Sequence, residues 1–363
     1  PPRRTDMAAA PDTPRTISST STVEPERIAT LVDHDVFGDG RYYHNWMQAS
    51  QRAEHNPALE HAIQRANEHE VPVVVAVVVV PDYPEAAARH FAFMLEGLGH
   101  TLTAVERRGA RACLRVGDPV EVIAELAAEA SEVVFDRGYL RHQQEWYDQL
   151  ASRIERRVTQ VEGDVVVPTA LASDRLETGA RTIRPRINDR RNDFLVALET
   201  TALDNHTTPQ GTTSDIGLDE LADPDSIAAV LDRLGVAGQP GPVAGWSPGT
   251  AGARAALSTF LDAVTSGDGY DEMRNRYTHD DGTSRLSPYL HFGQISPVQV
   301  ANIVIDRLGD DAEPFLEELI VRRELAVNYV LHNDDYDTFA GLPEWARTCL
   351  LYTSDAADDY LTV

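Results

Sequence analysis

The fold is decided by the stretch Val73–Val80, which reads VVVAVVVV. All but one of its residues are β-branched, and such side chains favour the extended chain of a strand. A strand with one wet face alternates apolar and polar residues, whereas this one is apolar on both faces, as in a parallel sheet covered by helices. The run is also too short for a membrane helix, which needs about 20 apolar residues. We therefore predict a strand buried on both faces.

Strands and helices alternate on both sides of this stretch. From the spacing of apolar residues, further strands are expected at 41–47, 112–116, 133–135 and 158–161, and helices at 56–70, 84–98, 119–130 and 143–154. The alternation predicts an α/β domain over residues 28–200 with a doubly wound, Rossmann-like parallel sheet. Ligands of such sheets bind beyond the carboxyl ends of the strands, where Asp136 and Arg137 lie.

A second domain begins near residue 253, where the strand signal disappears. Helices are expected at 253–264, 288–292, 297–308 and 313–330, which predicts an all-helical domain over residues 253–348. Residues 201–252 are poor in aromatic residues and rich in Thr, Asp, Gly and Pro, so we interpret them as an interdomain linker with one short helix at 226–234. Residues 1–27 are rich in Pro, Ser, Thr and Arg and are predicted to form a flexible tail.

The chain is strongly acidic. Its 58 Asp and Glu residues outnumber 32 basic residues, which are all arginine, and the formal net charge is −26. An acidic surface without lysine is typical of a halophilic protein, because carboxylates hold water while salt screens their repulsion; a generic acidic protein is the alternative. Acidity disfavours general nucleic-acid binding. A DNA-binding protein of this composition therefore needs local arginines, stacking and shape.

Composition also limits the class and location of the protein. A hydrophobic content of 42% over 363 residues indicates packed domains rather than disorder. Two cysteines exclude a disulfide framework, and no signal peptide or membrane span is visible, so we expect a cytoplasmic location. The sequence contains no phosphate loop ending in Gly-Lys, no GxSxG elbow and no zinc motif.

The strongest candidate for chemistry is the segment Gly282–Ser296, which reads GTSRLSPYLHFGQIS. Its Ser287-Pro288 pair is typical of a helix N-cap followed by proline at the first helical position. The hydroxyls of Thr283, Ser284 and Ser287 lie at this helix start, where free N–H groups and the helix dipole favour an anion such as a pyrophosphate. A well-capped helix without a ligand is the alternative.

Paired polar groups occur in two further places. Tyr270 and Arg274 stand one helical turn apart and together suit a phosphate or a base edge, although a solvated surface pair has the same spacing. In the last predicted helix, Glu324 and Asn328 share a face with apolar residues, and a polar group on such a face is costly to bury without a partner. Either this face is a binding site, or a salt bridge between Arg323 and a neighbouring glutamate accounts for it.

Together these segments resemble the photolyase/cryptochrome family, and in particular its class II branch. Gly282–Leu290 resembles the flavin-binding signature of the whole family. The class II character comes from segments at 45–52, 94–98, 136–141, 290–296 and 321–325. The similarity runs in order from residue 41 to residue 348, so it covers both predicted domains.

The resemblance implies a flavin site and a substrate site. The FAD phosphates and ribityl chain would be held by Tyr270, Thr283, Ser284, Arg285, Leu286 and Ser287. Arg274 and Glu324 match positions that contact the damaged pyrimidine pair, with Glu324 as the catalytic residue. Asn328 would lie one turn further on, at the substrate and beside the flavin. The α/β domain of many relatives holds an antenna chromophore, and we expect a deazaflavin here.

The implied activity is that of a cyclobutane pyrimidine dimer photolyase, a carbon–carbon lyase that repairs DNA. A dimer inside the stacked duplex is out of reach, so it is flipped into a pocket. Light-excited reduced FAD gives the dimer one electron, the ring opens and the electron returns, while the protein positions the reactants. The expected partner is ultraviolet-damaged DNA, with no membrane association, and the expected state is a monomer.

The resemblance ends at Thr348, and we expect the chain to be C-terminally truncated. Residues 349–363 resemble a translated sequencing adapter and are predicted to form a non-native tail. A cryptochrome-like blue-light sensor is the main alternative, but it needs no dimer contacts, so Arg274 and Glu324 favour repair. A non-catalytic α/β nucleotide binder is a second alternative, which the signature at 282–287 disfavours.

Overall fold

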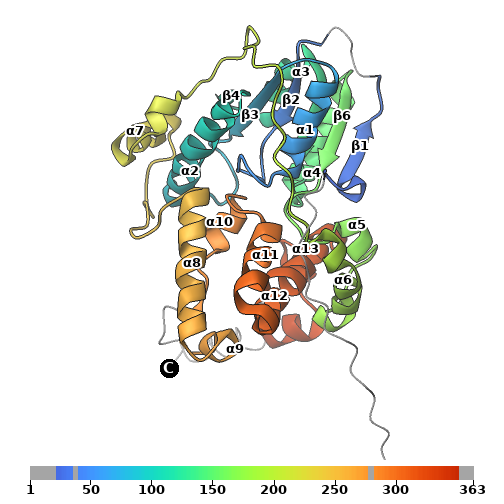
Figure 1. Ribbon diagram of the computed structural model, residues 1–363, viewed down its shortest axis with the longest axis vertical. Coiled ribbons are helices and arrows are strands. Elements are labelled where there is room, and N and C mark those ends of the chain that lie inside the picture. The colour runs from blue at the N-terminus through green and yellow to red at the C-terminus, as the bar shows by residue number, and fades with distance from the viewer. Residues whose placement is uncertain (1–21, 36–39, 277–281, 351–363) are drawn as a thin grey trace, which may run out of the picture.

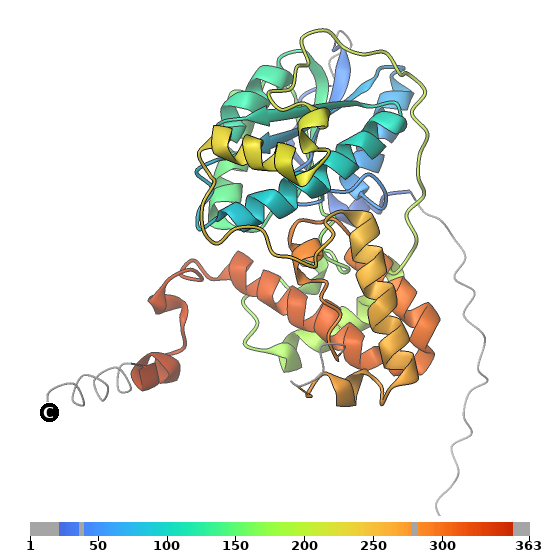
Figure 2. The same ribbon diagram turned by 90° about the vertical axis from the view of Figure 1, so that its left-hand side faces the viewer.

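The computed structural model describes residues 22–35, 40–276 and 282–350. An α/β part lies at the top of Figure 1 and a group of helices lies below it. The chain passes between the two parts more than once, because α5 and α6 lie in the lower part and α7 in the upper part. In Figure 2 the chain after α13 extends to one side of the helical part.

The upper part is built on a sheet whose strands lie in the order β1-β6-β5-β2-β3-β4. The strands are β1 (Ile28–Val32), β2 (Tyr42–Trp46), β3 (Val73–Val79), β4 (Arg111–Val116), β5 (Ala130–Asp136) and β6 (Arg157–Val161). From β2 the chain winds outward through β3 and β4, returns, and then winds outward through β5 and β6. This is the predicted doubly wound arrangement, and β3 is almost wholly buried, as its valines predict.

The edge strand β1 departs from the predicted parallel pattern. It pairs antiparallel with β6, with Ile28 opposite Val161, whereas the other neighbouring strands are parallel. No strand is predicted at these residues, which are largely exposed and lack a long apolar run. An antiparallel edge strand needs no crossover helix, so it adds to the sheet without changing the inner strands.

Helices cover both faces of the sheet. They are α1 (Pro57–Glu68), α2 (Ala88–Arg107), α3 (Pro119–Ala127) and α4 (Arg141–Arg153). The helices α1 and α2 share one apolar core on one face, and α3 and α4 share another. Asn56 and Asp118 accept hydrogen bonds from first-turn N–H groups, and a proline follows each, so α1 and α3 start close to where they are predicted. The helix predicted at 84–98 instead runs from Ala88 to Arg107.

The N-terminal tail ends earlier than predicted. Pro25–Arg27 form a short 3-10 turn, and the Arg27 guanidinium donates to the carbonyl oxygens of Val165 and Val166. Arg27 is buried by these contacts, which tie the residues before β1 to the segment after β6.

Parts of both predicted tails, residues 1–21 and 351–363, lie outside the described residues. The last two described residues, Cys349 and Leu350, are exposed. No helix within the described ranges has the length and apolar character that crossing a membrane requires.

The described residues from 250 onward form helices and no strand, as predicted. The helices are α8 (Thr250–Ser266), α9 (Tyr270–Met273), α10 (Ser287–His291), α11 (Pro297–Leu308), α12 (Glu313–Leu316) and α13 (Arg323–His332), with 3-10 turns at Gly309–Ala312 and Phe339–Gly341. Between α12 and α13 the chain forms a π-helix, Glu317–Arg322, inside the segment predicted as one α-helix. A π-helix takes in extra residues per turn, and this one lies in the middle of the predicted helix.

Two helices that lie within the residue range assigned to the α/β domain, and that were not predicted, pack with the helical part. They are α5 (Thr169–Ala172) and α6 (Ala180–Phe194), whose apolar side chains, such as Ile183 and Ile187, share one core with α8 and α11. The α6 helix was not expected from the sequence, and it contains Pro185.

The residues predicted as a linker pack on the α/β part. They contain a 3-10 turn, Leu218–Leu221, and α7 (Pro224–Leu234). The side chains of Leu221, Ile227 and Leu231 belong to the same core as α2. Much of the segment at 201–252 is therefore folded against its neighbour, and the domain boundaries drawn from the sequence stay a prediction.

Candidate functional site

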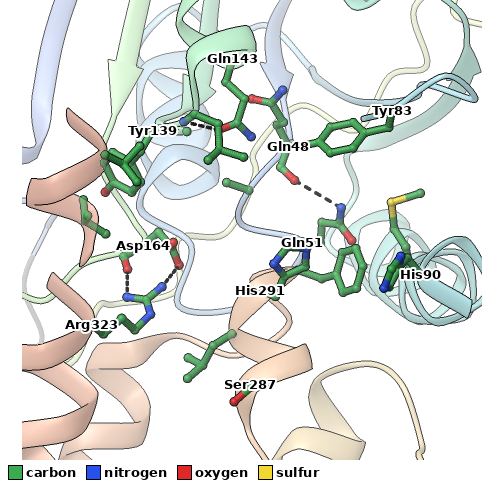
Figure 3. A pocket seen from close by; sticks show the side chains of 18 of the residues that line it. Gln48, Gln51, Tyr83, His90, Tyr139, Gln143, Asp164, Ser287, His291 and Arg323 are labelled. Atoms are coloured by element: carbon green, nitrogen blue, oxygen red, sulfur yellow. Dashed lines mark hydrogen bonds and ion pairs between the residues drawn. The ribbon is translucent and has the colours of Figure 1, made fainter. Parts of the chain in front are cut away.

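A cavity of about 930 Å³ lies between the carboxyl ends of the strands and the helices α10 to α13. Its volume is in the range of small-molecule and cofactor sites. Figure 3 shows polar side chains entering it from both parts of the molecule. The polar residues that line the cavity include Gln48, Gln51, Tyr83, Gln143 and Asp164 from the sheet side, and Tyr270, Ser284, Ser287, His291 and Arg323 from the helical side.

The sheet-side wall is fixed by Asp136 at the end of β5. Its buried carboxylate accepts hydrogen bonds from the backbone N–H groups of Gln48 at 3.0 Å, Ala49 at 3.1 Å and Ser50 at 2.5 Å. Burial raises the pKa of Asp136 to about 6, although these hydrogen bonds act in the opposite direction. Asp136 thus shapes the loop after β2, and neither it nor Arg137 is among the lining residues.

The same loop joins the two parts of the molecule. The N–H of Gln51 donates to the carbonyl oxygen of Phe292 at 3.2 Å, and the buried Arg52 donates to that of Gly293 at 3.0 Å. Gly293 has φ of 63°, and a Cβ there would lie 1.9 Å from the carbonyl oxygen of Ala49. Only glycine fits this backbone angle and this close approach without strain.

The predicted cap of α10 is wrong. The helix begins at Ser287 itself, Leu286 stands at the N-cap position, and no side chain caps the helix. Leu286 has helical backbone angles, so the chain enters the helix without the extended residue that a serine cap requires. Ser287 instead lines the cavity together with Tyr270, so the predicted pocket shared by these two residues is confirmed.

Part of the predicted flavin-binding set lines the cavity: Tyr270, Ser284, Leu286 and Ser287. Tyr270 packs edge-on against Phe315 with ring centroids 5.3 Å apart, and burial raises its pKa. Thr283 and Arg285 are exposed and are not among the lining residues. The Arg285 guanidinium lies 5.2 Å from the ring centre of Trp246.

Arg274 lies beside Tyr270 but outside the cavity lining. Its guanidinium is 5.8 Å from the ring centre of Tyr270 and forms ion pairs with Glu318 at 2.7 Å and Asp271 at 3.2 Å. Glu318 lines the cavity, so the ion pair reaches the rim of the site.

Glu324 is buried on α13 and contacts the segment after β6 rather than lining the cavity. Its Oε1 accepts hydrogen bonds from the N–H groups of Val166 at 2.6 Å and Val167 at 3.3 Å, and its Oε2 has no hydrogen-bond partner among the described residues. Burial raises the pKa of Glu324 to about 8, because it outweighs these hydrogen bonds and the nearby Arg323.

Asn328 holds the same segment one turn further along α13. Its side chain accepts a hydrogen bond from the N–H of Glu177 at 2.8 Å and donates to the carbonyl oxygen of Arg175 at 2.9 Å. The predicted face shared with Ile320 assumed a continuous α-helix. The cavity is lined instead by Leu319, Arg323, Ala326, Val327 and Val330, and Ile320, Glu324 and Asn328 are all buried outside this lining.

A charged pair at the cavity wall was missed from the sequence. Arg323 Nη2 lies 2.7 Å from Asp164 Oδ1, as Figure 3 shows. The alternative weighed above paired Arg323 with a neighbouring glutamate, but its partner comes from the loop after β6, 159 residues earlier. The sequence indicated that Arg323 could form a salt bridge, but no nearby residue identified Asp164 as the partner.

Known proteins resemble this chain in sequence and in fold. The model of the DNA photolyase family matches residues 45–205. A deoxyribodipyrimidine photo-lyase from Methanothermobacter thermautotrophicus is 35% identical over 334 residues, which cover 91% of this chain and 70% of that protein. The chain belongs to the DNA photolyase family.

Other relatives agree with this assignment. A deoxyribodipyrimidine photo-lyase from Potorous tridactylus is 32% identical over 84% of this photolyase-family chain, which spans 56% of that protein's length. The crystal structure of a class III photolyase from Agrobacterium tumefaciens superposes with a TM-score of 0.59 at 20% identity, over 83% of this chain and 63% of that one. The superposition shows a shared fold.

A cluster of aromatic side chains lies at the sheet end of the cavity in this member of the photolyase family. Tyr83 and Trp146 line the cavity, and the ring of His142 lies 5.0 Å from each of them. His142 Nε2 is also 2.9 Å from the Tyr83 hydroxyl. No local pattern singles out these residues, because they come from a loop and from a helix that tertiary packing brings together.

Proposed function

We propose that the protein is a class II deoxyribodipyrimidine photo-lyase, which uses light to split cyclobutane pyrimidine dimers in ultraviolet-damaged DNA. The observation that carries this proposal is the 35% identity to a curated deoxyribodipyrimidine photo-lyase over 91% of the chain. That alignment includes residues from both parts of the fold, and the cavity lies between those parts. The activity is that of a carbon–carbon lyase.

FAD fits the cavity. The wall combines apolar side chains such as Leu286 and Leu319 with the hydroxyls of Tyr270, Ser284 and Ser287, the mixture that cofactor sites show. These hydroxyls would bind the phosphates and the sugar chain, while the apolar side chains exclude water. When bound in its reduced form, the flavin supplies the electron that light transfers to the substrate. Thr283 and Arg285 stay predicted contacts.

Glu324 is the residue to which we assign stabilisation of the charged dimer. With its pKa raised to about 8, the carboxyl group carries a proton at neutral pH. Oε1 accepts hydrogen bonds from the N–H groups of Val166 and Val167, whereas Oε2 has no partner among the described residues, and we assign the proton to Oε2 as the donor to a pyrimidine carbonyl. Arg274 and Asn328 are the further proposed substrate contacts.

The class II assignment is supported by the way its sequence segments meet. Residues 45–52 are held by the carboxylate of Asp136 and by backbone groups of residues 290–296. Gly97 leaves room for the amide of Gln294, since a Cβ at Gly97 would lie 2.0 Å from its Nε2. Segments that resemble the class II branch thus form one seam between the two parts of the molecule.

The sheet end of the cavity is the proposed site of a second chromophore, and a deazaflavin is the proposed molecule. The rings of Tyr83, His142 and Trp146 present an aromatic surface there, which suits a flat conjugated ring. Gln48 and Gln143 add amide groups to the same wall.

The test is repair in solution. The full chain, loaded with reduced FAD, is mixed with an oligonucleotide that carries one cyclobutane thymine dimer and is illuminated, and restored thymines are counted. We expect dimers to disappear in the light and to persist in the dark. A chain that binds FAD but leaves the dimers intact under light would contradict the proposal and favour a cryptochrome-like sensor.

A further inference from the structure

The segment after β6 is held by arginine side chains along its backbone. Five consecutive carbonyl oxygens, those of residues 162–166, accept hydrogen bonds from guanidinium groups. The donors are Arg27 before β1, Arg52 after β2 and Arg323 on α13. A guanidinium is costly to take out of water, so three of them on one irregular stretch of backbone indicate that its position is closely specified.

Arg27 binds two neighbouring carbonyl groups of this segment with one guanidinium. Its Nη1 donates to the carbonyl oxygen of Val165 at 2.9 Å, and its Nη2 donates to that of Val166 at 2.8 Å. Its Nε donates to the carboxylate of Glu24 at 2.9 Å, and its guanidinium carbon lies 5.4 Å from the ring centre of Phe194. These contacts bury the side chain and fix it in one orientation.

Glu324 binds the opposite ends of the same two peptide groups. The peptide group between residues 165 and 166 presents its C=O to Arg27 and its N–H to Glu324 Oε1, at 2.6 Å. The peptide group between residues 166 and 167 does the same, with its N–H at 3.3 Å from Oε1. Two peptide groups therefore lie between a guanidinium and a carboxyl group, with each end bound.

A charge at one end of a peptide group changes the hydrogen bond at its other end. The guanidinium draws electron density toward the carbonyl oxygen, which makes the N–H of the same peptide group a stronger donor, and hydrogen bonds in such a chain strengthen one another in the protein interior. A stronger donor favours the charged carboxylate over the neutral acid. Arg27 also fixes the planes of both peptide groups, and so the direction in which their N–H groups point.

Two ion pairs lie beside Glu324. Arg323, the preceding residue on α13, is paired with Asp164 at 2.7 Å, and Arg27 is paired with Glu24 at 2.9 Å. Both arginines lower the pKa of Glu324, against the larger effect of burial. Of the two, Arg27 acts on the N–H donors themselves, because the carbonyl that Arg323 binds belongs to a peptide group that does not contact Glu324.

We infer that Arg27 is a positioning residue for Glu324 and acts on it through the peptide groups that join residues 165, 166 and 167. The inference deepens the proposed function and rests on it, because that function makes Glu324 the donor to the substrate. Arg27 is not among the residues that line the cavity. It orients Glu324 and sets its proton affinity from the other side of the segment after β6.

The test follows the protonation of Glu324 in the full chain by infrared spectroscopy. The carbonyl stretch of protonated carboxyl groups is recorded from about pH 6.5 to about pH 10, and the band that is missing in Glu324→Gln is assigned to Glu324. In Arg27→Gln the charge behind both peptide groups is lost, so we expect the midpoint to rise by about 1 pH unit, a tenfold change in proton affinity. Arg27→Lys keeps the charge and should restore most of the original midpoint.

Glu24→Gln should shift the midpoint in the opposite direction. This substitution removes the acidic partner of Arg27, while the glutamine still accepts the hydrogen bond from Nε, so the uncompensated guanidinium should lower the midpoint below that of the unchanged chain. The Glu24 side chain is 20% exposed, so its replacement disturbs the packing less than that of Arg27. A midpoint that stays constant or rises in Glu24→Gln contradicts the inference even where thermal unfolding shows that Arg27→Gln is not folded.

The matched control is Arg52→Gln. Arg52 is also buried and donates to the carbonyl oxygen of Gly163 at 2.8 Å, but the N–H of that peptide group belongs to Asp164 and does not bind Glu324. We expect this variant to keep the midpoint of the unchanged chain. An unchanged midpoint in folded Arg27→Gln would overturn the inference, and so would equal rises in Arg27→Gln and Arg52→Gln, because these would reflect the loss of positive charge alone.

Dimer splitting by the same proteins separates this inference from the proposed function. If the unchanged chain splits dimers but Arg27→Gln keeps its midpoint, the positioning role fails and photo-lyase activity stands. If the midpoints shift as expected but no protein splits dimers in the light, the action of Arg27 on Glu324 stands and the photo-lyase proposal fails. If both hold, the pH at which the repair yield falls should rise in Arg27→Gln together with the infrared midpoint.

Discussion

His44 in the central strand β2 is a buried residue whose charge state affects stability. Its ring is fully buried, and neither ring nitrogen has a hydrogen-bond partner among the described residues. Burial lowers its pKa from 6.5 to about 3. Between these two values the unfolded chain binds a proton that the folded chain does not, so the free energy of unfolding is highest above about pH 6.5 and falls as the pH drops toward 3.

Replacing this ring with an apolar side chain removes the acid sensitivity that it causes. We compare the unfolding free energy of His44→Leu with that of the unchanged chain at about pH 7.5 and at about pH 5. On going to the lower pH, we expect this difference to shift by about 2 kcal/mol in favour of the variant. Urea unfolding at the two pH values measures this difference. If the unfolding free energies of the two proteins change by the same amount between the two pH values, His44 does not contribute to the acid sensitivity.

Glu324 allows a second test with a pH dependence of the opposite sign. Its folded pKa of about 8 lies above the ordinary 4.5, so the folded chain binds the extra proton, and its contribution to stability falls as the pH rises from 4.5 to 8. Under the proposed function, repair per absorbed photon should also fall as the pH rises through about 8, because the donated proton is lost.

Two substitutions separate the roles of this side chain. Glu324→Gln keeps an acceptor for Val166 and a neutral donor, so we expect near-normal stability and a repair yield that no longer falls through pH 8. Glu324→Ala leaves the two N–H groups unpaired, at a cost of about 1–3 kcal/mol, and should repair poorly while FAD stays bound. Normal repair by the alanine variant with normal FAD content would remove Glu324 from the mechanism.

At the scale of elements, the contact between the loop after β2 and the turn after α10 holds the two parts together. Gly293→Ala would bring a Cβ to 1.9 Å from the carbonyl oxygen of Ala49, in a backbone with φ of 63°. We expect a loss of more than about 2 kcal/mol in unfolding free energy, together with weaker FAD binding, because this contact lies beside the cavity.

Gly211 provides the matched control for this element. It also has a positive φ, 85°, but a Cβ there would meet no atom within 4 Å. Gly211→Ala therefore measures the backbone strain alone, about 1 kcal/mol, and should leave FAD binding unchanged. Equal losses in the two variants would show that the close approach at Gly293 contributes nothing.

At the scale of the whole molecule, the net charge of −26 predicts that salt stabilises the fold. Raising KCl from about 0.1 M to about 1 M shortens the Debye length from about 10 Å to about 3 Å, which screens repulsion between the surface carboxylates. We expect the urea midpoint of unfolding to rise over this range. A midpoint that stays constant or falls would contradict the halophilic interpretation of the composition.

The sequence by itself determined the features that depend on neighbouring residues. The valines of β3 specify a buried strand through local side-chain preference, and their alternation with helical segments specifies a doubly wound sheet. Asn56 and Asp118 specify two helix starts, because a cap and its partner lie within one turn. Tyr270 and Ser287 were also expected to share a pocket, since each lies in a recognisable short segment, and both line the cavity.

Tertiary structure alone decided the features that join distant residues. The partner of Arg323 is Asp164 and the partners of Glu324 are Val166 and Val167, all more than 150 residues away. The helical spacing placed Glu324 and Asn328 on one face, but it did not show that this face packs on the segment after β6 and that the neighbouring face, with Leu319 and Arg323, lines the cavity. The direction of β1 and the packing of α6 on the helical core likewise depend on which surfaces meet, and no local pattern encodes that.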